Sequence, residues 1–97
     1  MNTFRFSVAG SFSLADISDH LSLQEAKNTE FLDSKVAYLN GEVVNLVTFN
    51  LYDDATLPTE LILKKKSETP PPNATQFWEG VMAADNALVV VAAYRAK

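Results

Sequence analysis

The alternation of apolar and polar residues is most regular over residues 34–52, where two stretches of this pattern meet at Asn40-Gly41. A type I′ turn of two residues needs a positive φ at both central positions, and Asn-Gly adopts this conformation readily. The stretch therefore predicts a long β-hairpin, around which we expect the rest of the chain to be arranged. The expected cross-strand pairs are Leu39 with Glu42, Tyr38 with Val43, Ala37 with Val44 and Val36 with Asn45.

Three further stretches have the patterns of β-strands. Residues 3–9 alternate between apolar and polar, as a strand with one buried face does. Residues 60–66 form a short strand that ends in three lysines, a feature that is typical of the edge of a sheet. Residues 87–94 are apolar throughout, which favours a central strand covered on both faces.

The segment after the first strand has the spacing of a helix. Residues 13–16, Ser-Leu-Ala-Asp, fit a capping box, and Leu14, Ile17 and Leu21 follow on one face. The box pattern recurs at residues 22–25. Two helix starts so close together predict a bend, with a second short helix that ends near Asn28.

A second helical segment is predicted after the prolines at residues 70–72. Asn73 can cap it, and Phe77, Trp78, Val81 and Met82 recur at helical spacing before a stop at Asn86. The element order is then β-α-β-β-β-α-β. We therefore expect an α+β fold, a two-layer sandwich with an antiparallel sheet around the long hairpin and two helical segments. The pattern leaves open whether Trp78 lies in the core or at an interface.

Length and composition indicate a single small domain over residues 1–97. The chain has 97 residues, of which 47% are hydrophobic and 21% charged, and it contains no cysteine, which excludes disulfides and thiolate metal sites. No apolar run approaches the ~20 residues that cross a bilayer, and the first residues lack the apolar stretch of a signal peptide. We expect a cytoplasmic monomer that does not contact a membrane.

Residues that could carry out chemistry are few. His20 is the only histidine, whereas a zinc site needs three or four ligands. No serine stands in a Gly-x-Ser-x-Gly motif, and the three glycines are too dispersed for a phosphate-binding loop. We therefore expect neither enzymatic activity nor a cofactor or metal site.

Charge is distributed unevenly along the chain. The net charge is −4, and residues 6–63 carry nine acids against two lysines. Carboxylates one helical turn apart lie ~5–6 Å from each other, which is comparable to the spacing of phosphates along one DNA strand. The hypothesis that follows is an acidic face that mimics DNA and binds a basic protein surface. Its candidate partner-binding residues are Asp16, Asp19, Glu25, Glu30 and Asp33.

In size, acidity, absence of cysteine and absence of a catalytic motif, the chain resembles the small phage-encoded anti-CRISPR proteins. It looks most like the inhibitors of type I-F CRISPR surveillance complexes, some of which mimic DNA. The resemblance is one of character over the whole chain, and the acidic stretch at residues 14–33, LADISDHLSLQEAKNTEFLD, corresponds to the mimicking surface. It implies an inhibitor that blocks target DNA binding in the bacterial host's cytoplasm, without touching nucleic acid itself. The lysine run and the modest net charge imply that the mimicry is local.

Two alternatives stay open. Lys64, Lys65 and Lys66, together with the aromatic rings of Tyr38 and Tyr52, would suit a small oligonucleotide-binding barrel, in which cations follow the phosphates and rings stack on the bases of a single strand. The other alternative is a phage structural or assembly subunit, which would associate with copies of itself.

Overall fold

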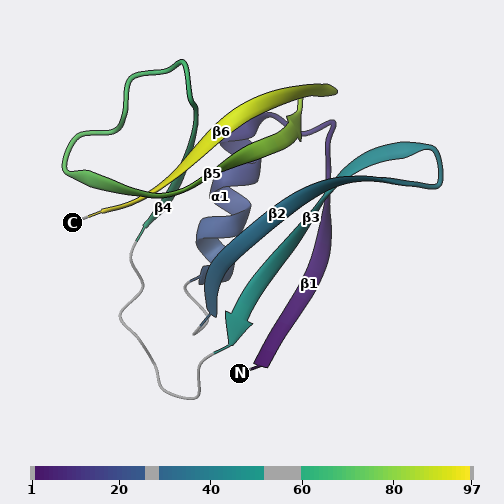
Figure 1. Ribbon diagram of the computed structural model, residues 1–97, viewed down its shortest axis with the longest axis horizontal. Helices are drawn as coiled ribbons and strands as arrows, with labels where there is room; N and C mark the ends of the chain where they lie inside the picture. The colour runs from purple at the N-terminus through teal and green to yellow at the C-terminus, as the bar shows by residue number, and fades with distance from the viewer. Residues whose placement is uncertain (1, 26–28, 52–59, 97) are drawn as a thin grey trace.

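The computed structural model describes residues 2–25, 29–51 and 60–96. Within them, six strands and one helix follow each other along the chain (Figure 1). The elements are β1 (Asn2–Ala9), α1 (Leu14–Glu25), β2 (Thr29–Leu39), β3 (Glu42–Leu51), β4 (Leu61–Lys65), β5 (Ala74–Ala84) and β6 (Ala87–Ala96). The strands form two antiparallel three-stranded sheets, sheet A with the order β1-β3-β2 and sheet B with the order β4-β6-β5.

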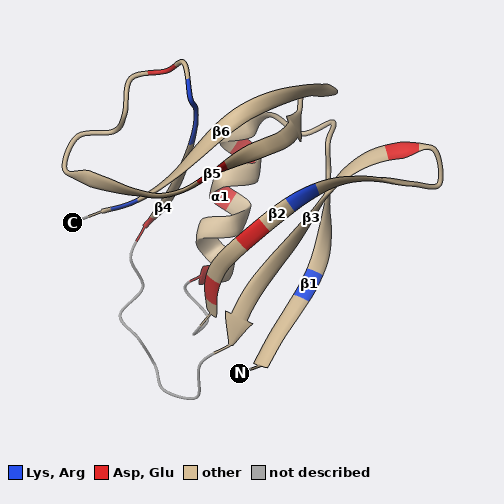
Figure 2. Ribbon diagram, viewed as in Figure 1, with Lys and Arg blue, Asp and Glu red and all other residues tan. Residues whose placement is uncertain are grey.

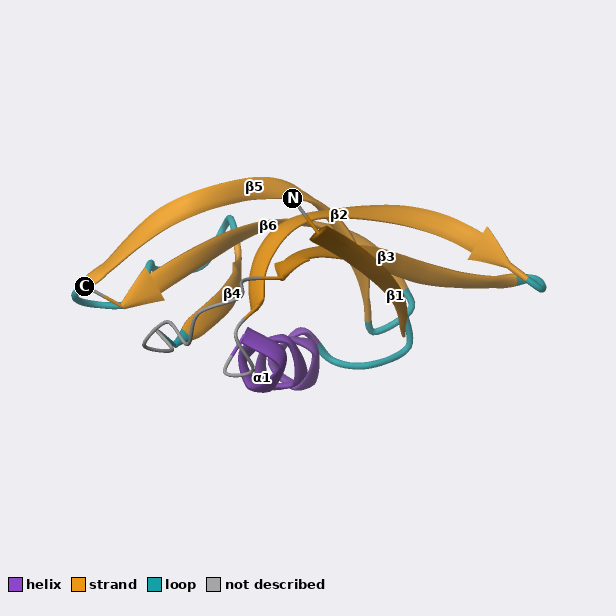
Figure 3. Cartoon of the chain, turned by 90° about the horizontal axis from the view of Figure 1, so that it is seen from below, coloured by secondary structure: helices purple, strands orange, loops and turns teal. Residues whose placement is uncertain are grey.

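The two sheets lie side by side and curve into an arch, and α1 packs against the concave side (Figure 3). The core fills the space between the helix and the two sheets. Its fully buried side chains come from α1 and from both sheets, among them Ile17, Leu21, Phe31, Val47, Phe49, Leu61, Met82 and Val91. One helix thus supplies the apolar cover for both sheets, because it lies beneath the region where they meet.

The predicted hairpin and its register are confirmed. Asn40 and Gly41 have φ values of 52° and 80°, and β2 and β3 pair in the expected register from Leu39 and Glu42 onward. The strand β2 begins earlier than predicted, at Thr29, and a bulge separates Phe31 from Asp33. The tip of the hairpin projects beyond the rest of the arch (Figure 1).

The other three predicted strands are also present. Residues 3–9 lie in β1, and residues 60–66 include β4, which is an edge strand of sheet B. Residues 87–94 lie in β6, the central strand of that sheet. Burial on both faces of β6 is limited to residues 91–94, whereas Leu88 and Val90, nearer the β5–β6 turn, are 65% and 48% exposed.

The predicted second helical segment is wrong, because these residues form the strand β5 instead. Adjacent apolar residues such as Val81 and Met82 fit a helical stripe, yet in a strand they point to opposite faces. Val81 is 47% exposed and Met82 is fully buried, as a strand requires. The expected stop at Asn86 is a two-residue hairpin turn, in which Asp85 and Asn86 have φ values of 53° and 60°.

The predicted bend in the first helical segment is also wrong. The first capping box is correct in that the Ser13 Oγ accepts the Asp16 N–H at 3.1 Å. The helix then continues to Glu25 without interruption, and Ser22 lies inside it. The expected helix end near Asn28 lies outside the described residues. The Ser22 side chain accepts a hydrogen bond from β4 and does not cap a second helix. An α+β sandwich with two helical segments is therefore the wrong fold class, since the described chain is mostly β with one helix.

Candidate partner-binding site

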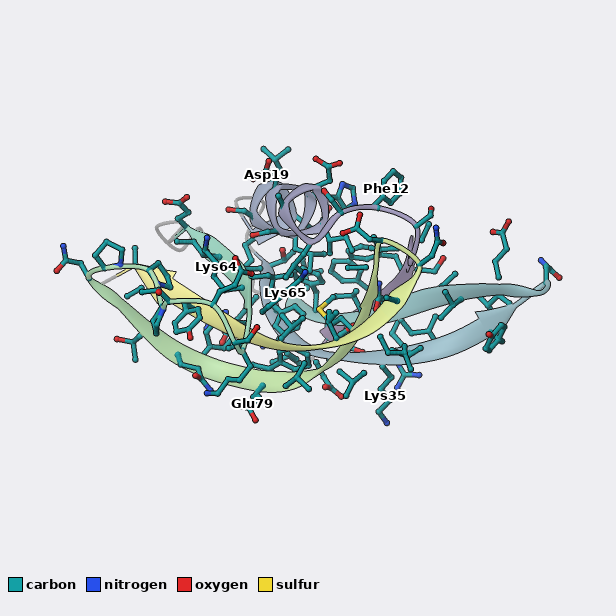
Figure 4. All side chains as sticks on the ribbon, turned by 90° about the horizontal axis from the view of Figure 1, so that it is seen from above. Phe12, Asp19, Lys35, Lys64, Lys65 and Glu79 are labelled. Atoms are coloured by element: carbon teal, nitrogen blue, oxygen red, sulfur yellow. The ribbon has the colours of Figure 1, made fainter. Side chains whose placement is uncertain are left out.

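The five carboxylates predicted to bind a partner lie on α1 and along β2 (Figure 2). Asp16 and Asp19 are exposed and lie one turn apart on the helix. Figure 4 shows the Asp19 side chain pointing away from the sheets. Neither carboxylate forms a salt bridge with any residue that the structure describes. These two acids are therefore available to a partner.

Glu25 has a different environment, because it is buried at the end of the helix. Its Oε2 accepts the Phe31 N–H at 2.8 Å and the Arg95 Nη2 at 2.7 Å. The Arg95 guanidinium also lies 3.7 Å from the centre of the Phe77 ring. Glu25 thus ties the helix to strands β2 and β6, and its role in this arrangement is structural.

The two carboxylates on β2 also have partners within the fold. The Glu30 Oε1 lies 3.9 Å from the Arg95 Nη1. The Asp33 Oδ1 accepts a hydrogen bond from the Trp78 Nε1 at 3.1 Å, across the junction of β2 and β5. Trp78 itself packs against the core, with its ring edge-on to Phe31. The structure therefore brings Asp16 and Asp19 together on one surface and uses Glu25 and Asp33 for internal hydrogen bonds.

A groove of about 330 Å³ runs between β1 and α1, and Asp16 forms part of its lining. Its lining includes the buried side chains of Val8 and Ile17, with Phe12 at 52% exposure. Asp16 and His20 contribute its polar part. Figure 4 places Phe12 on the same side of the arch as the helix. The sequence did not suggest this groove, since Phe12 lies in a connection without a motif.

The other side of α1 borders on β4. A second hollow there is lined by Asp19, Glu60 and Lys64, among other residues. The two hollows flank the helix, so that Asp16 borders one of them and Asp19 the other. The exposed surface of α1 therefore has a hollow on each side.

The lysine run and the tyrosines of the nucleic-acid alternative do not form one platform in the described structure. The Lys66 Nζ forms a salt bridge with the Glu79 Oε1 at 2.9 Å and contacts the Gln76 Oε1 at 3.0 Å. The hydrogen bond from Lys66 to Glu79 and the positive charge of Lys66 lower the pKa of the Glu79 carboxyl. Tyr38 is exposed near the tip of the β2–β3 hairpin, far from β4 (Figure 1), and Tyr52 lies outside the described residues.

In residues 2–25, 29–51 and 60–96, no group of three or more His, Cys, Asp or Glu side chains could hold a metal ion. The single described helix is too short and too polar to cross a membrane. Comparison with protein families, curated proteins and solved structures finds no match to this chain.

Proposed function

We propose that the protein is a non-enzymatic binding protein that docks on a basic surface of a partner protein through the exposed face of α1. The observation that carries this proposal is the exposure of Asp16 and Asp19, which form no salt bridge with the described residues. Residues three apart on a helix lie on the same face, ~5–6 Å from each other. Leu23 continues this stripe and is 68% exposed, so the face combines two charges with an apolar contact.

The chemistry of this face selects the kind of partner. Two carboxylates on a chain with a net charge of −4 attract a cluster of Lys or Arg side chains, and salt screens this attraction over ~8–10 Å. A protein surface that binds DNA is a basic surface of this kind. Docking there would exclude DNA by occupying its site, as the resemblance to inhibitors of type I-F surveillance complexes implies. Because the described helix face has only two free carboxylates, it would occupy the place of only a short piece of DNA backbone on the partner.

A competition assay tests this proposal with matched charge variants. Purified type I-F surveillance complex is mixed with labelled target DNA, and the protein is titrated in. The Asp16→Asn/Asp19→Asn variant should compete at least about tenfold less well than wild type, equivalent to ~1.4 kcal/mol of binding free energy. The control Glu42→Gln/Glu79→Gln removes the same charge from two exposed positions, of which Glu79 lies on the side of the sheets opposite α1 (Figure 4), and should compete as wild type does. Equal losses in both variants would refute a specific role of the helix face.

Two further observations separate this proposal from its alternatives. Labelled single-stranded DNA should not be retarded by the protein, whereas a nucleic-acid-binding module would retard it. Sedimentation at micromolar concentration should show a monomer, whereas a structural subunit would associate with copies of itself.

A further inference from the structure

Side chains of the helix α1 form hydrogen bonds with the outer edge of β4. Antiparallel sheets leave unpaired N–H and C=O groups at their outer strands, and these groups can pair with another chain. On β4, the Leu63 N–H donates to the Ser18 Oγ at 2.9 Å and the Leu61 N–H donates to the Ser22 Oγ at 3.3 Å. Two serine side chains of α1 thus take the place that a neighbouring strand would occupy.

The edges of β5 and β2 are closed at their junction. The Ala83 N–H donates to the Asn45 Oδ1 at 2.8 Å, and the Asn45 Nδ2 donates to the Ala83 carbonyl at 2.8 Å. On β2, the Phe31 N–H donates to the Glu25 carboxylate. The Trp78–Asp33 hydrogen bond also links these two strands. At three of the four outer strands, side chains therefore bond some of the outward backbone groups or link the strand to its neighbour.

The fourth outer strand, β1, has no hydrogen-bond partner along its outer edge among the residues that the structure describes. The Gly10 N–H donates to the Val43 carbonyl at 3.0 Å, directly after the pair of Ala9 and Val44. Backbone groups in an antiparallel ladder point to the partner strand at every second residue. The N–H and C=O groups of Arg5 and Ser7 therefore point away from β3. No other described element donates or accepts a hydrogen bond there.

The groove between β1 and α1 lies directly beside this free edge. A strand that paired with β1 would direct every second side chain to the helix side of the sheet. There it would meet the apolar side chains of Val8, Phe12 and Ile17, with Asp16 and His20 beside them. The site thus offers backbone hydrogen bonds to a paired strand, an apolar groove for one of its side chains and a negative charge for another. These are the features by which proteins recognise a peptide that adds to a sheet as a strand.

We propose that an extended segment of a partner protein pairs with β1 as a fourth strand of sheet A. Its helix-side positions carry an apolar residue, which fills the groove, followed two residues later by a Lys or Arg that faces Asp16. That the partner is basic rests on the proposed function. That the partner binds as an added strand rests on the free edge of β1 and on the groove, independently of the proposed function.

A second copy of the chain fits this site less well than a basic partner segment. The helix-side residues of its own β1 are Phe4, Phe6 and Val8, which pack against its own core. They include no cation that would face Asp16. Two copies would also bring together surfaces that each carry the same exposed acids. Charge complementarity therefore favours a different protein with a basic strand.

Peptide binding with two variants of the site tests the inference. The probe is a labelled synthetic peptide of Thr-Val-Thr-Lys repeats, and a peptide of Thr-Val-Thr-Glu repeats is its opposite-charge control. Ser7→Pro removes an N–H that points away from β3, so the ladder of sheet A keeps its hydrogen bonds. Phe12→Ala removes the exposed ring from the groove, and Leu88→Ala is its control because Leu88 is 65% exposed on a different sheet. Thermal melting of each variant reports on its fold.

We expect wild type and Leu88→Ala to bind the lysine peptide and not the glutamate peptide, and Ser7→Pro and Phe12→Ala to bind at least about tenfold more weakly. If the folded Ser7→Pro variant binds the lysine peptide as wild type does, strand addition is overturned. This holds even if Asp16→Asn/Asp19→Asn loses affinity, a result that would leave the proposed function standing. If Ser7→Pro loses affinity for the lysine peptide while Asp16→Asn/Asp19→Asn binds it as wild type does, strand addition is upheld and the role of the two acids is refuted. Absence of peptide binding, or self-association of wild type that Ser7→Pro abolishes, would also overturn the inference.

Discussion

Replacement of Asn45 by alanine should strongly destabilise the fold, because this side chain joins the two sheets. Asn45 lies on β3, the central strand of sheet A, and is fully buried. Its amide accepts the N–H of Ala83 and donates to the carbonyl of Ala83, both at 2.8 Å, and lies 3.4 Å from the Val8 carbonyl. Ala83 is itself fully buried on the edge strand β5, so water cannot replace the lost amide without entering the junction.

The magnitude follows from the groups that the Asn45→Ala substitution leaves unpaired. A buried donor or acceptor without a partner costs ~1–3 kcal/mol, so the N–H and C=O of Ala83 together cost about 2–6 kcal/mol. Small domains have total stabilities of only ~5–15 kcal/mol. At ~4–8 °C per kcal/mol for a chain of this size, even the lower limit predicts a melting temperature about 8–16 °C below that of wild type.

The same strand provides a matched control. Asn50 is buried as well, but its Oδ1 has no hydrogen-bond partner in the described structure. Asn50→Ala removes the same atoms without leaving a bonded backbone group of the described residues unpaired, and should cost less than ~1 kcal/mol. Urea unfolding and thermal circular dichroism measure both variants. Equal losses of stability for Asn45→Ala and Asn50→Ala would refute the reasoning that the amide bridge holds the sheets together.

Three further predictions concern single contacts. Ser18→Ala leaves a buried N–H of β4 unpaired and should lower the free energy of unfolding by ~1–3 kcal/mol in urea titrations. Gly80→Ala places a Cβ 2.5 Å from the Trp78 ring and should cost ~1–3 kcal/mol, with a change in the fluorescence of the only tryptophan. Because Lys66 lowers the pKa of Glu79, their pair stabilises the fold above the unfolded carboxyl's pKa and loses this effect as the pH falls through the folded pKa. The melting temperatures of wild type and Glu79→Gln should therefore converge at strongly acidic pH in low salt.

Local sequence signals predicted the β-hairpin and its register because the turn depends on only two residues. Asn40-Gly41 can adopt the required positive φ values whatever surrounds them, and the pairing of β2 with β3 follows from the turn length. The lysine run at the end of β4 marked an edge strand for an equally local reason. In these cases the tertiary structure adds burial without changing the local conformation.

The signal at β5 was ambiguous for a physical reason. Two adjacent apolar pairs, Phe77-Trp78 and Val81-Met82, satisfy the helical period, whereas a bulge between Gln76 and Trp78 disrupts the alternation expected of a strand. Pairing with the apolar strand β6 decides the conformation, and that pairing is a tertiary effect. The turn at Asp85-Asn86 has the same geometry as a typical Asn-Gly hairpin turn but lacks its characteristic glycine.

The candidate site shows the same limit. Helical spacing correctly placed Asp16 and Asp19 on the exposed side of α1. Glu25 is withdrawn from the surface by Arg95, which lies 70 residues later in the chain and gives no local signal. The groove depends on where α1 packs relative to the edge of β1, which no spacing along the sequence encodes.

Amide hydrogen exchange of the wild-type protein, alone and with the Thr-Val-Thr-Lys peptide, tests most directly whether a partner docks at α1 and β1. The account predicts slower exchange at the outward N–H groups of Arg5 and Ser7 and along the α1 side of the groove, with the tip of the β2–β3 hairpin unchanged. Slower exchange confined to sheet B or to the tip of the β2–β3 hairpin, with β1 unaffected, would contradict it.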